Sequence, residues 1–297
     1  MTKEGRVITR RDFLRAGAVA AAAAGMPRLA QAADEAPAQQ RARVVLVRDR
    51  QVFRPDGSLN AEVLARMLDQ GVAALLEVEE PQEGWRRLVE PGDLVGLKTN
   101  VWQSLPTPPS LIEAMRRRIV EAGVRADAIA VDDQGARRTL ARCTALLNAR
   151  PLRTHHWAAI GGCLKNYIPF VPRPSDYHPD VCADLGHIWT LPIVAGKTRL
   201  NVLAVLTPLF YGRGPHHFDR RYVWPYGGLL VSRDPVAADS VGVRILEAKR
   251  RQHFGEERPL GPLAKHVRYA ESRYGVGISD PGRIDLVRVG WQEDVLI

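Results

Sequence analysis

The strongest constraint on the fold is an alternation of apolar strand patterns with amphipathic helix patterns. Strand patterns cover Arg43–Asp49, Leu94–Lys98 and Ala128–Asp133, and helix patterns cover Leu59–Glu77 and the segment from Pro109 to Gly123. Such alternation is typical of a parallel sheet with helices on its faces. The sequence therefore predicts an α/β fold with a mostly parallel sheet flanked by helices.

The remaining elements follow from the same patterns. A helix is expected from Ala136 to about Asn148, and after Pro151 the periodicity gives way to a loop-rich central insertion that lasts to about Lys197. Long loops in a compact domain are usually functional. The pattern resumes with strands at Arg199–Leu206, Gly227–Ser232 and Ile284–Val289, and helices from Pro235 to about Arg251 and from Pro262 to Tyr274.

The first 32 residues have the three parts of an export signal. A basic head contains Arg10 and Arg11, a short alanine-rich run follows, and Ala30-Gln31-Ala32 offers a small-x-small cleavage site. The run is much shorter than the roughly 20 apolar residues that span a bilayer. We expect a twin-arginine signal peptide over residues 1–32, cleavage after Ala32, handling by the twin-arginine translocase, and release into the periplasm with no membrane anchor.

The remaining chain is expected to comprise a polar tether over residues 33–42 and a single domain over 43–297. This mature part has 36 basic and 31 acidic residues, a net charge of +5 against +9 for the whole chain. So small an excess does not predict nucleic-acid binding. Cys143, Cys163 and Cys182 are widely spaced, so we expect no cysteine-ligated iron–sulfur cluster.

Four separated stretches together resemble the domain-of-unknown-function 362 (DUF362) family. They are VGLKTN (95–100), THHWAAIGGCLKN (154–166), LNVLAVLTPLFYGRGP (200–215) and GGLLVSRDPVAADSVG (227–242). The chain differs from the family pattern at Thr99, Gly161 and about Val205, and it lacks the ferredoxin-like module of many relatives. The resemblance implies a fold and a site region, whereas the family's reaction is not settled.

Six residues are the candidate ligand-binding residues: Lys98, Asn100, His155, Lys165, Asn166 and Asp239. The two lysine–asparagine pairs suit an anion, and the end of the Leu94–Lys98 strand is where open α/β sheets place ligands. His155 falls on the histidine of the family motif and is the candidate metal ligand. Asp132, Asp133 and Asp234 are interpreted mainly as helix caps.

These residues leave two hypotheses for function. The first is an exported protein that binds a metal, a redox cofactor or an anionic ligand in a cleft at the strand ends. The twin-arginine route, which carries folded proteins, raises the expectation of a bound group. The second is a non-catalytic binding or assembly partner of another periplasmic protein. The identity of any cofactor, and whether the protein is an enzyme, stay open at this point.

Overall fold

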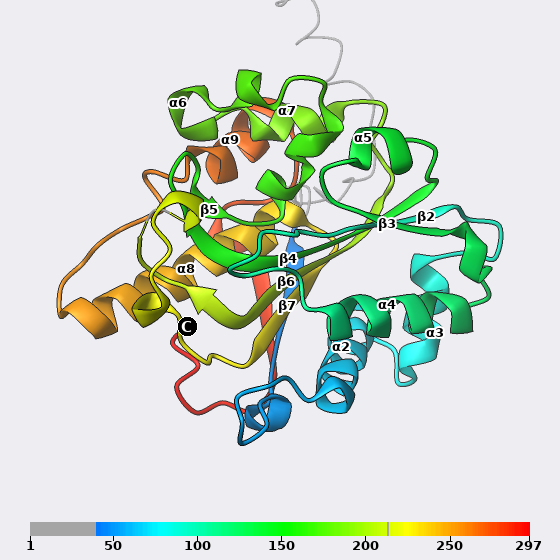
Figure 1. Cartoon of the computed structure of the whole chain (residues 1–297), viewed down its shortest axis with the longest axis horizontal. Coiled ribbons are helices and arrows are strands. Elements are labelled where there is room, and N and C mark those ends of the chain that lie inside the picture. Colours follow the sequence, from blue (N-terminus) through cyan, green and yellow to red (C-terminus); the bar gives the residue numbers. More distant parts are fainter. Residues whose placement is uncertain (1–39, 213) are drawn as a thin grey trace, which may run out of the picture. The chain divides into compact units, whose positions relative to one another are not determined.

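The computed structural model describes residues 40–212 and 214–297 and places eight strands in one sheet (Figure 1). The signal peptide, with Arg10, Arg11 and Ala32, and nearly all of the expected tether lie outside the described residues. The strands are β1 (Ala42–Arg48), β2 (Val95–Lys98), β3 (Ile129–Asp132), β4 (Ala145–His155), β5 (Ala159–Gly161), β6 (Thr198–Leu209), β7 (Gly228–Ser232) and β8 (Ile284–Gly290).

The sheet is mostly parallel, as predicted. Its order is β3-β2-β4-β6-β7-β1-β8, and β5 pairs with β4 beside this path. Within the path only β7 runs against its two neighbours, β6 and β1, and the short β5 is antiparallel to β4. The carboxyl ends of β3, β2, β4 and β6 consequently meet at one edge of the sheet.

Helices cover both faces of this sheet. They are α2 (Ala61–Leu76), α3 (Pro81–Leu88), α4 (Pro109–Glu121), α5 (Ala136–Thr139), α6 (Pro179–Cys182), α7 (Leu185–Thr190), α8 (Pro235–Phe254) and α9 (Lys265–Tyr274). One apolar core lies under α2, α3 and α4, and the other lies under α5, α7, α8 and α9. Figure 1 shows α6, α7 and α9 grouped apart from α2, α3 and α4.

Side chains alternate between these two cores along the strands. In β1, Val44 and Leu46 enter the core under α8, and Val45 and Val47 enter the core under α2. A strand that is covered on both sides must be apolar at successive positions. This requirement explains the unbroken apolar runs from which the central strands were predicted.

Two predicted helix starts have the expected caps. The Asn60 side chain accepts hydrogen bonds from the backbone N–H groups of Glu62 and Val63 at the start of α2. Asp234 accepts from Val236 and Ala237 at the start of α8, where Pro235 occupies the first helical position. Both caps satisfy N–H groups that the helix cannot pair itself.

The segment from Ala136 to Pro151 departs from its prediction. The helix expected to reach Asn148 ends at Thr139, and residues 145–155 form β4, all of whose residues are buried. Asn148, Arg150, Pro151 and Arg153 interrupt the apolar run of this strand, so its pattern did not resemble that of a strand. The polar side chains are tolerated inside because they form the site described below.

The stretch predicted to be loop-rich contains short helices. Its largest is the 3₁₀ helix η3 (Leu164–Phe170), followed by α6 and α7. Asp180, Val181 and Cys182 all have positive φ angles, between 48° and 59°. Left-handed backbone costs about 1–2 kcal/mol per residue outside glycine. Packing must therefore hold this turn in place, and Cys182 is fully buried there.

Candidate anion-binding site

A cavity of about 630 Å³ lies where the carboxyl ends of β2, β3 and β4 meet. Of the six candidate residues, Asn100, His155, Lys165 and Asn166 line it, while Lys98 and Asp239 are fully buried and do not. The lining is dominated by hydrogen-bond donors and rings, and its polar and aromatic members are Asn100, Trp102, Asp133, Gln134, Arg137, Arg138, Arg150, Arg153, His155, Trp157, Lys165, Asn166 and His178.

The topology of the sheet explains why a cavity forms here. After β2 the chain enters α4 on one face, and after β4 it continues through β5 into η3 on the other face. Chains that leave neighbouring parallel strands towards opposite faces open a crevice between the strand ends, where open α/β sheets bind ligands. The cavity lies at this switch point.

Arg150 and Arg153 extend from the end of β4 into the cavity. The pairing of β2 with β4 stops at Asn148, so both arginines lie beyond the end of β2. They are only 3% and 2% exposed, and the Nε atom of each has no hydrogen-bond partner among the described residues. Burial lowers the pKa of both guanidinium groups. A guanidinium nevertheless stays protonated in proteins, so two cations face this cavity.

Arg153 is held in place by two contacts. Its Nη1 donates to Asn100 Oδ1 at 3.0 Å, and its guanidinium carbon lies 4.3 Å from the centre of the Trp102 ring. Cation–π stacking of this kind orients a guanidinium without neutralising it. Asn100 therefore positions Arg153 and also lines the cavity itself.

Lys98 forms a closed ion pair beneath the cavity. Its Nζ donates to Asp133 Oδ1 at 2.5 Å and to the Thr99 carbonyl at 2.7 Å. The other carboxylate oxygen of Asp133 accepts the Val101 N–H at 2.9 Å. Burial lowers the pKa of Lys98 to about 8, and Asp133 opposes this shift. The pair fixes the loop after β2 and uses two of the three donors of Lys98 Nζ within the protein.

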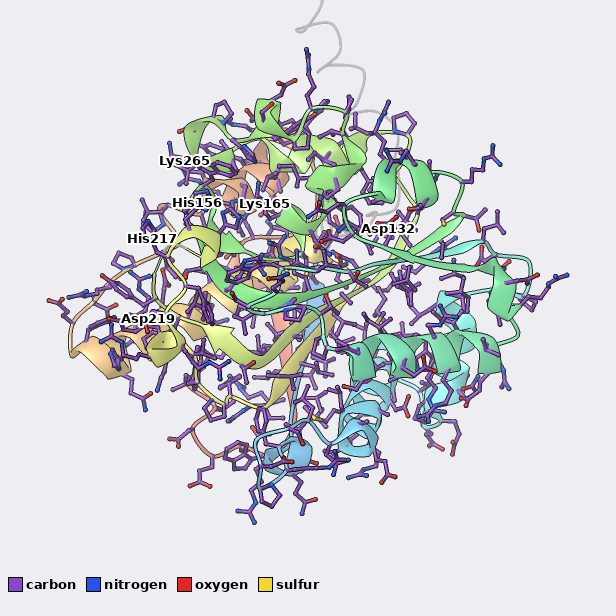
Figure 2. The ribbon with its side chains drawn as sticks, in the orientation of Figure 1. Asp132, His156, Lys165, His217, Asp219 and Lys265 are labelled. Carbon is purple, nitrogen blue, oxygen red and sulfur yellow. The ribbon has the colours of Figure 1, made fainter. Side chains whose placement is uncertain are left out.

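Lys165 has a different environment. It lines the cavity from η3, is 4% exposed, and makes no ion pair with any carboxylate in residues 40–212 and 214–297. Burial lowers its pKa to about 8, and its hydrogen-bonding neighbour is the Cys182 thiol. Figure 2 shows Lys165 between the labelled His156 and Asp132. Lys165 is thus a buried amine without a counter-ion.

Three asparagines connect the cavity to the centre of the sheet. Asn166 Nδ2 donates to Asn148 Oδ1 at 2.7 Å and to the Lys98 carbonyl at 3.3 Å, and Asn148 Nδ2 donates to Asn201 Oδ1 at 2.9 Å. Asn201 donates in turn to the carbonyl groups of Ser232 and Arg233. We call this series the asparagine ladder, and it fixes η3 on the strand ends.

Asp239 supports the turn that carries Lys165. From the first turns of α8, its two oxygens accept the backbone N–H groups of Cys163 and Leu164 at 2.6 and 2.9 Å. Burial raises the pKa of Asp239 to about 6. A Cβ on Gly162 would lie 2.1 Å from Asp239 Oδ1, so only glycine fits at this approach. Asp239 acts here through backbone N–H groups at the start of η3.

His155 lies at the boundary between two cavities. Besides the cavity described above, it borders a second one of about 520 Å³ on the side of Tyr211 and Arg250. Its Nδ1 accepts the Trp157 N–H at 3.2 Å, which places the proton of the neutral ring on Nε2. Burial lowers its pKa, so the ring stays neutral. In this state His155 presents a donor, whereas a metal ligand presents a lone pair.

The described residues contain no group of three or more His, Cys, Asp or Glu side chains arranged to hold a metal ion. The three cysteines are free and buried. Asp132, which was interpreted as a cap, accepts the Gly135 N–H at 2.9 Å and the Thr139 hydroxyl at 2.5 Å, and so stabilises the turn into α5. Asp133 instead neutralises Lys98.

Arg150, Arg153, Asn148 and Asn201 were absent from the candidate residues. The first three belong to β4, which was expected to be the end of a helix and the start of a loop. A strand assignment for residues 145–155 would have placed their polar side chains at the carboxyl edge of the sheet. Asn201 carried no signal of its own, because a single polar residue in a strand has many structural explanations.

Comparison with known families tests the resemblance. Residues 131–244 match the family described as Domain of unknown function (DUF362), and residues 7–27 match the twin-arginine translocation pathway signal sequence. Residues 131–244 are thus similar to this family. The resemblance and the export signal are both confirmed, and the DUF362 match includes Arg150, Arg153, His155, Lys165 and Asp239 but neither Lys98 nor Asn100.

No curated protein and no solved structure shows significant similarity to the chain. The twin-arginine signal indicates that this protein is exported across a membrane. Among the residues that the structure describes, no helix is both long enough and apolar enough to cross a bilayer.

Proposed function

We propose that this exported DUF362 protein binds a small carboxylate- or phosphate-bearing molecule in the cavity at the ends of β2, β3 and β4. The observation that carries the proposal is a set of three buried cations, Arg150, Arg153 and Lys165, that form no ion pair with any carboxylate of the described chain. Asp133, the one acidic residue in the lining, already pairs with Lys98.

Electrostatics favours an anion at this place. A buried charge without a partner costs several kcal/mol, since it has lost its hydration without gaining a countercharge. An anionic ligand would supply that countercharge and accept hydrogen bonds from the guanidinium groups that line the cavity. Charge-assisted bonds between guanidinium groups and carboxylate or phosphate are among the strongest in proteins.

The same lining favours an anion over a metal ion. Guanidinium, ammonium and the Nε2–H of His155 are donors, while metal ions require lone pairs from their ligands. We place this exported protein in the periplasm, where it would meet such anions. Both an enzyme and a binding protein would use this site in the same first step.

Calorimetric and thermal-unfolding measurements test the proposal. A ligand that binds only the folded state at a hundred times its dissociation constant stabilises it by about 2.7 kcal/mol. Protein purified natively should therefore unfold at a higher temperature than protein that has been denatured, dialysed and refolded. Inorganic phosphate or citrate should restore part of the difference.

Two variants localise the effect. Arg150→Met and Arg153→Met should each remove most of the anion-dependent stabilisation, whereas Arg125→Met, which changes an exposed arginine, should retain it. Equal stabilisation of all three variants by phosphate would count against this cavity as the binding site.

The periplasmic location has its own test. Replacing Arg10 and Arg11 by lysine keeps the positive charge but removes the guanidinium pair of the signal. The precursor should then stay in the cytoplasm, as fractionation and immunoblotting would show. Normal appearance of a chain that begins at Ala33 in the periplasm would contradict export by this route.

A further inference from the structure

We propose that Lys165 is a nucleophilic amine that forms a Schiff base with a small carbonyl compound bearing an acid group, such as a 2-oxo acid. The inference rests on the proposed function, because the arginines that bind the acid group are those of the same cavity. It adds a substrate class and a covalent step to that function.

The contrast between two buried lysines carries the inference. Lys98 donates to Asp133 and to the Thr99 carbonyl, and the carboxylate holds its amine as a charged, structural group. Lys165 lines the cavity and has no carboxylate partner in the described ranges. A lysine that is desolvated and lies near other cations is an activated nucleophile, because its neutral form is more populated than that of an ordinary lysine.

Among the described residues, no carboxylate is among the groups that face Lys165. Burial and then the charge of Arg150 lower its pKa to about 8, and Cys182 opposes this shift. His178 and His266 also face it, and burial keeps both rings neutral by lowering each pKa. The Cys182 thiol is its hydrogen-bonding neighbour, and burial raises the pKa of that thiol. A neutral thiol cannot hold Lys165 as an ion pair.

The arginines specify which carbonyl compound fits. Arg150 and Arg153 line the cavity and form no ion pair within the described residues, so their guanidinium groups can donate to a carboxylate. In a 2-oxo acid the carbonyl carbon is bonded directly to the carboxylate. Binding of the acid group by these guanidinium groups therefore places the carbonyl within the cavity that Lys165 lines.

The covalent step requires no oxidant or reductant. A proton first leaves Nζ, whose lone pair then attacks the carbonyl carbon to form a C–N bond. The carbonyl oxygen takes up protons and leaves as water, while the nitrogen becomes a protonated imine. Ammonium and carbonyl are thus converted to iminium and water, and the bound carboxylate balances the positive charge that remains on nitrogen.

Reductive trapping tests the proposal on the mature protein. Sodium cyanoborohydride is added with pyruvate or glyoxylate, and modified lysines are identified by peptide mass spectrometry. Labelling at Lys165 should exceed that at the half-buried Lys249, which does not line the cavity, about tenfold or more, because a desolvated amine among cations has the larger neutral fraction. Excess inorganic phosphate should suppress labelling at Lys165 and leave Lys249 unchanged.

Three controls keep the test decisive. Acetone, which has a carbonyl but no acid group, should label Lys165 about tenfold less than pyruvate, since it lacks the carboxylate that the arginines bind. Lys165→Arg keeps the charge and should abolish trapping at this position. Circular dichroism of this variant and of Lys165→Met establishes that each is folded.

The outcomes separate this proposal from the proposed function. If phosphate stabilises the protein but pyruvate does not label Lys165, the Schiff-base proposal is overturned and anion binding stands. Equal labelling by acetone and pyruvate would overturn the substrate class. If neither stabilisation nor labelling occurs, both proposals fail.

Discussion

Lys98 and Lys165 occupy the same edge of one sheet and carry the same side chain, yet their surroundings differ. The charge of Lys98 is compensated, since its amine donates to the Asp133 carboxylate and to a carbonyl group. The charge of Lys165 is not compensated, since cations, neutral rings and a thiol face it. The ion pair of Lys98 with Asp133 stabilises a loop, whereas an amine without a counter-ion is available to a ligand. Burial alone therefore does not distinguish a structural lysine from a functional one.

The largest expected effect comes from removing the carboxylate that pairs with Lys98. Asp133→Ala leaves Lys98 buried without a countercharge and should lower the free energy of unfolding by about 3–5 kcal/mol. Urea denaturation measures this change. Asp127→Ala, at an exposed ion pair with Arg125, should cost less than about 1 kcal/mol.

Removing the charge of Lys165 should have the opposite effect on stability. Lys165→Met removes a buried charge that has no partner, so this variant should be as stable as the parent protein or more stable. If Lys165→Met destabilises the protein as strongly as Asp133→Ala, then Lys165 has a counter-ion and the contrast between the two lysines is wrong.

A smaller effect is expected from the turn that carries Lys165. Gly162→Ala places a methyl group against Asp239 and should cost about 1–3 kcal/mol through overpacking. Thermal unfolding measures the loss, and anion binding should weaken with it because η3 shifts. Gly92→Ala, where a Cβ meets no atom within 4 Å, is the matched control and should be nearly neutral.

The sequence predicted most of this fold but only part of this site. Apolar runs covered on both faces, the Asn60 and Asp234 caps and the glycine and proline boundaries located the strands and long helices. β4 was missed because the buried polar residues Asn148, Arg150 and Arg153 interrupt its pattern. Their pairing partners come from β6, η3 and the loop after β2, and no local pattern contains such information. The pairing of Lys98 with Asp133 could not be predicted from the sequence for the same reason.

The pH dependence of anion binding tests whether the Lys165 ammonium takes part in it. Because the pKa of Lys165 is lowered to about 8, its ammonium is present below that pH and is lost above it. Affinity for phosphate should therefore fall as the pH rises from about 7 to about 9, by roughly tenfold if one charge-assisted hydrogen bond of about 1.5 kcal/mol is lost. Isothermal titration calorimetry at a series of pH values measures it.

Lys165→Arg provides the control for this titration. The guanidinium stays protonated throughout, so the fall between these pH values should become clearly smaller. Lys98 also has a pKa of about 8, and it keeps its own contribution in the variant. An unchanged pH profile in Lys165→Arg would assign the titration to Lys98 instead.

The smallest expected effect concerns Asn100. Asn100→Ala removes the acceptor of the Arg153 Nη1 bond and should weaken phosphate binding by about 0.5–1.5 kcal/mol, while the Trp102 stacking still orients the guanidinium. Asn60→Ala removes the N-cap side chain of α2, which does not line the cavity. This variant should be less stable and should have an unchanged affinity for phosphate. A loss of affinity in Asn60→Ala equal to that in Asn100→Ala would remove the special role of Asn100.

The asparagine ladder has a direction, and this direction leaves one buried oxygen without a donor. Both donor positions of Asn166 are used, so its Oδ1 is fixed as an acceptor and has no partner among the described residues. Reversing that amide would place two acceptors against each other at Asn148 and at the Lys98 carbonyl. A buried acceptor without a donor costs about 1–3 kcal/mol. The packing of η3 and the donor bonds of Asn166 therefore hold the amide in this direction against the cost of its unpaired oxygen.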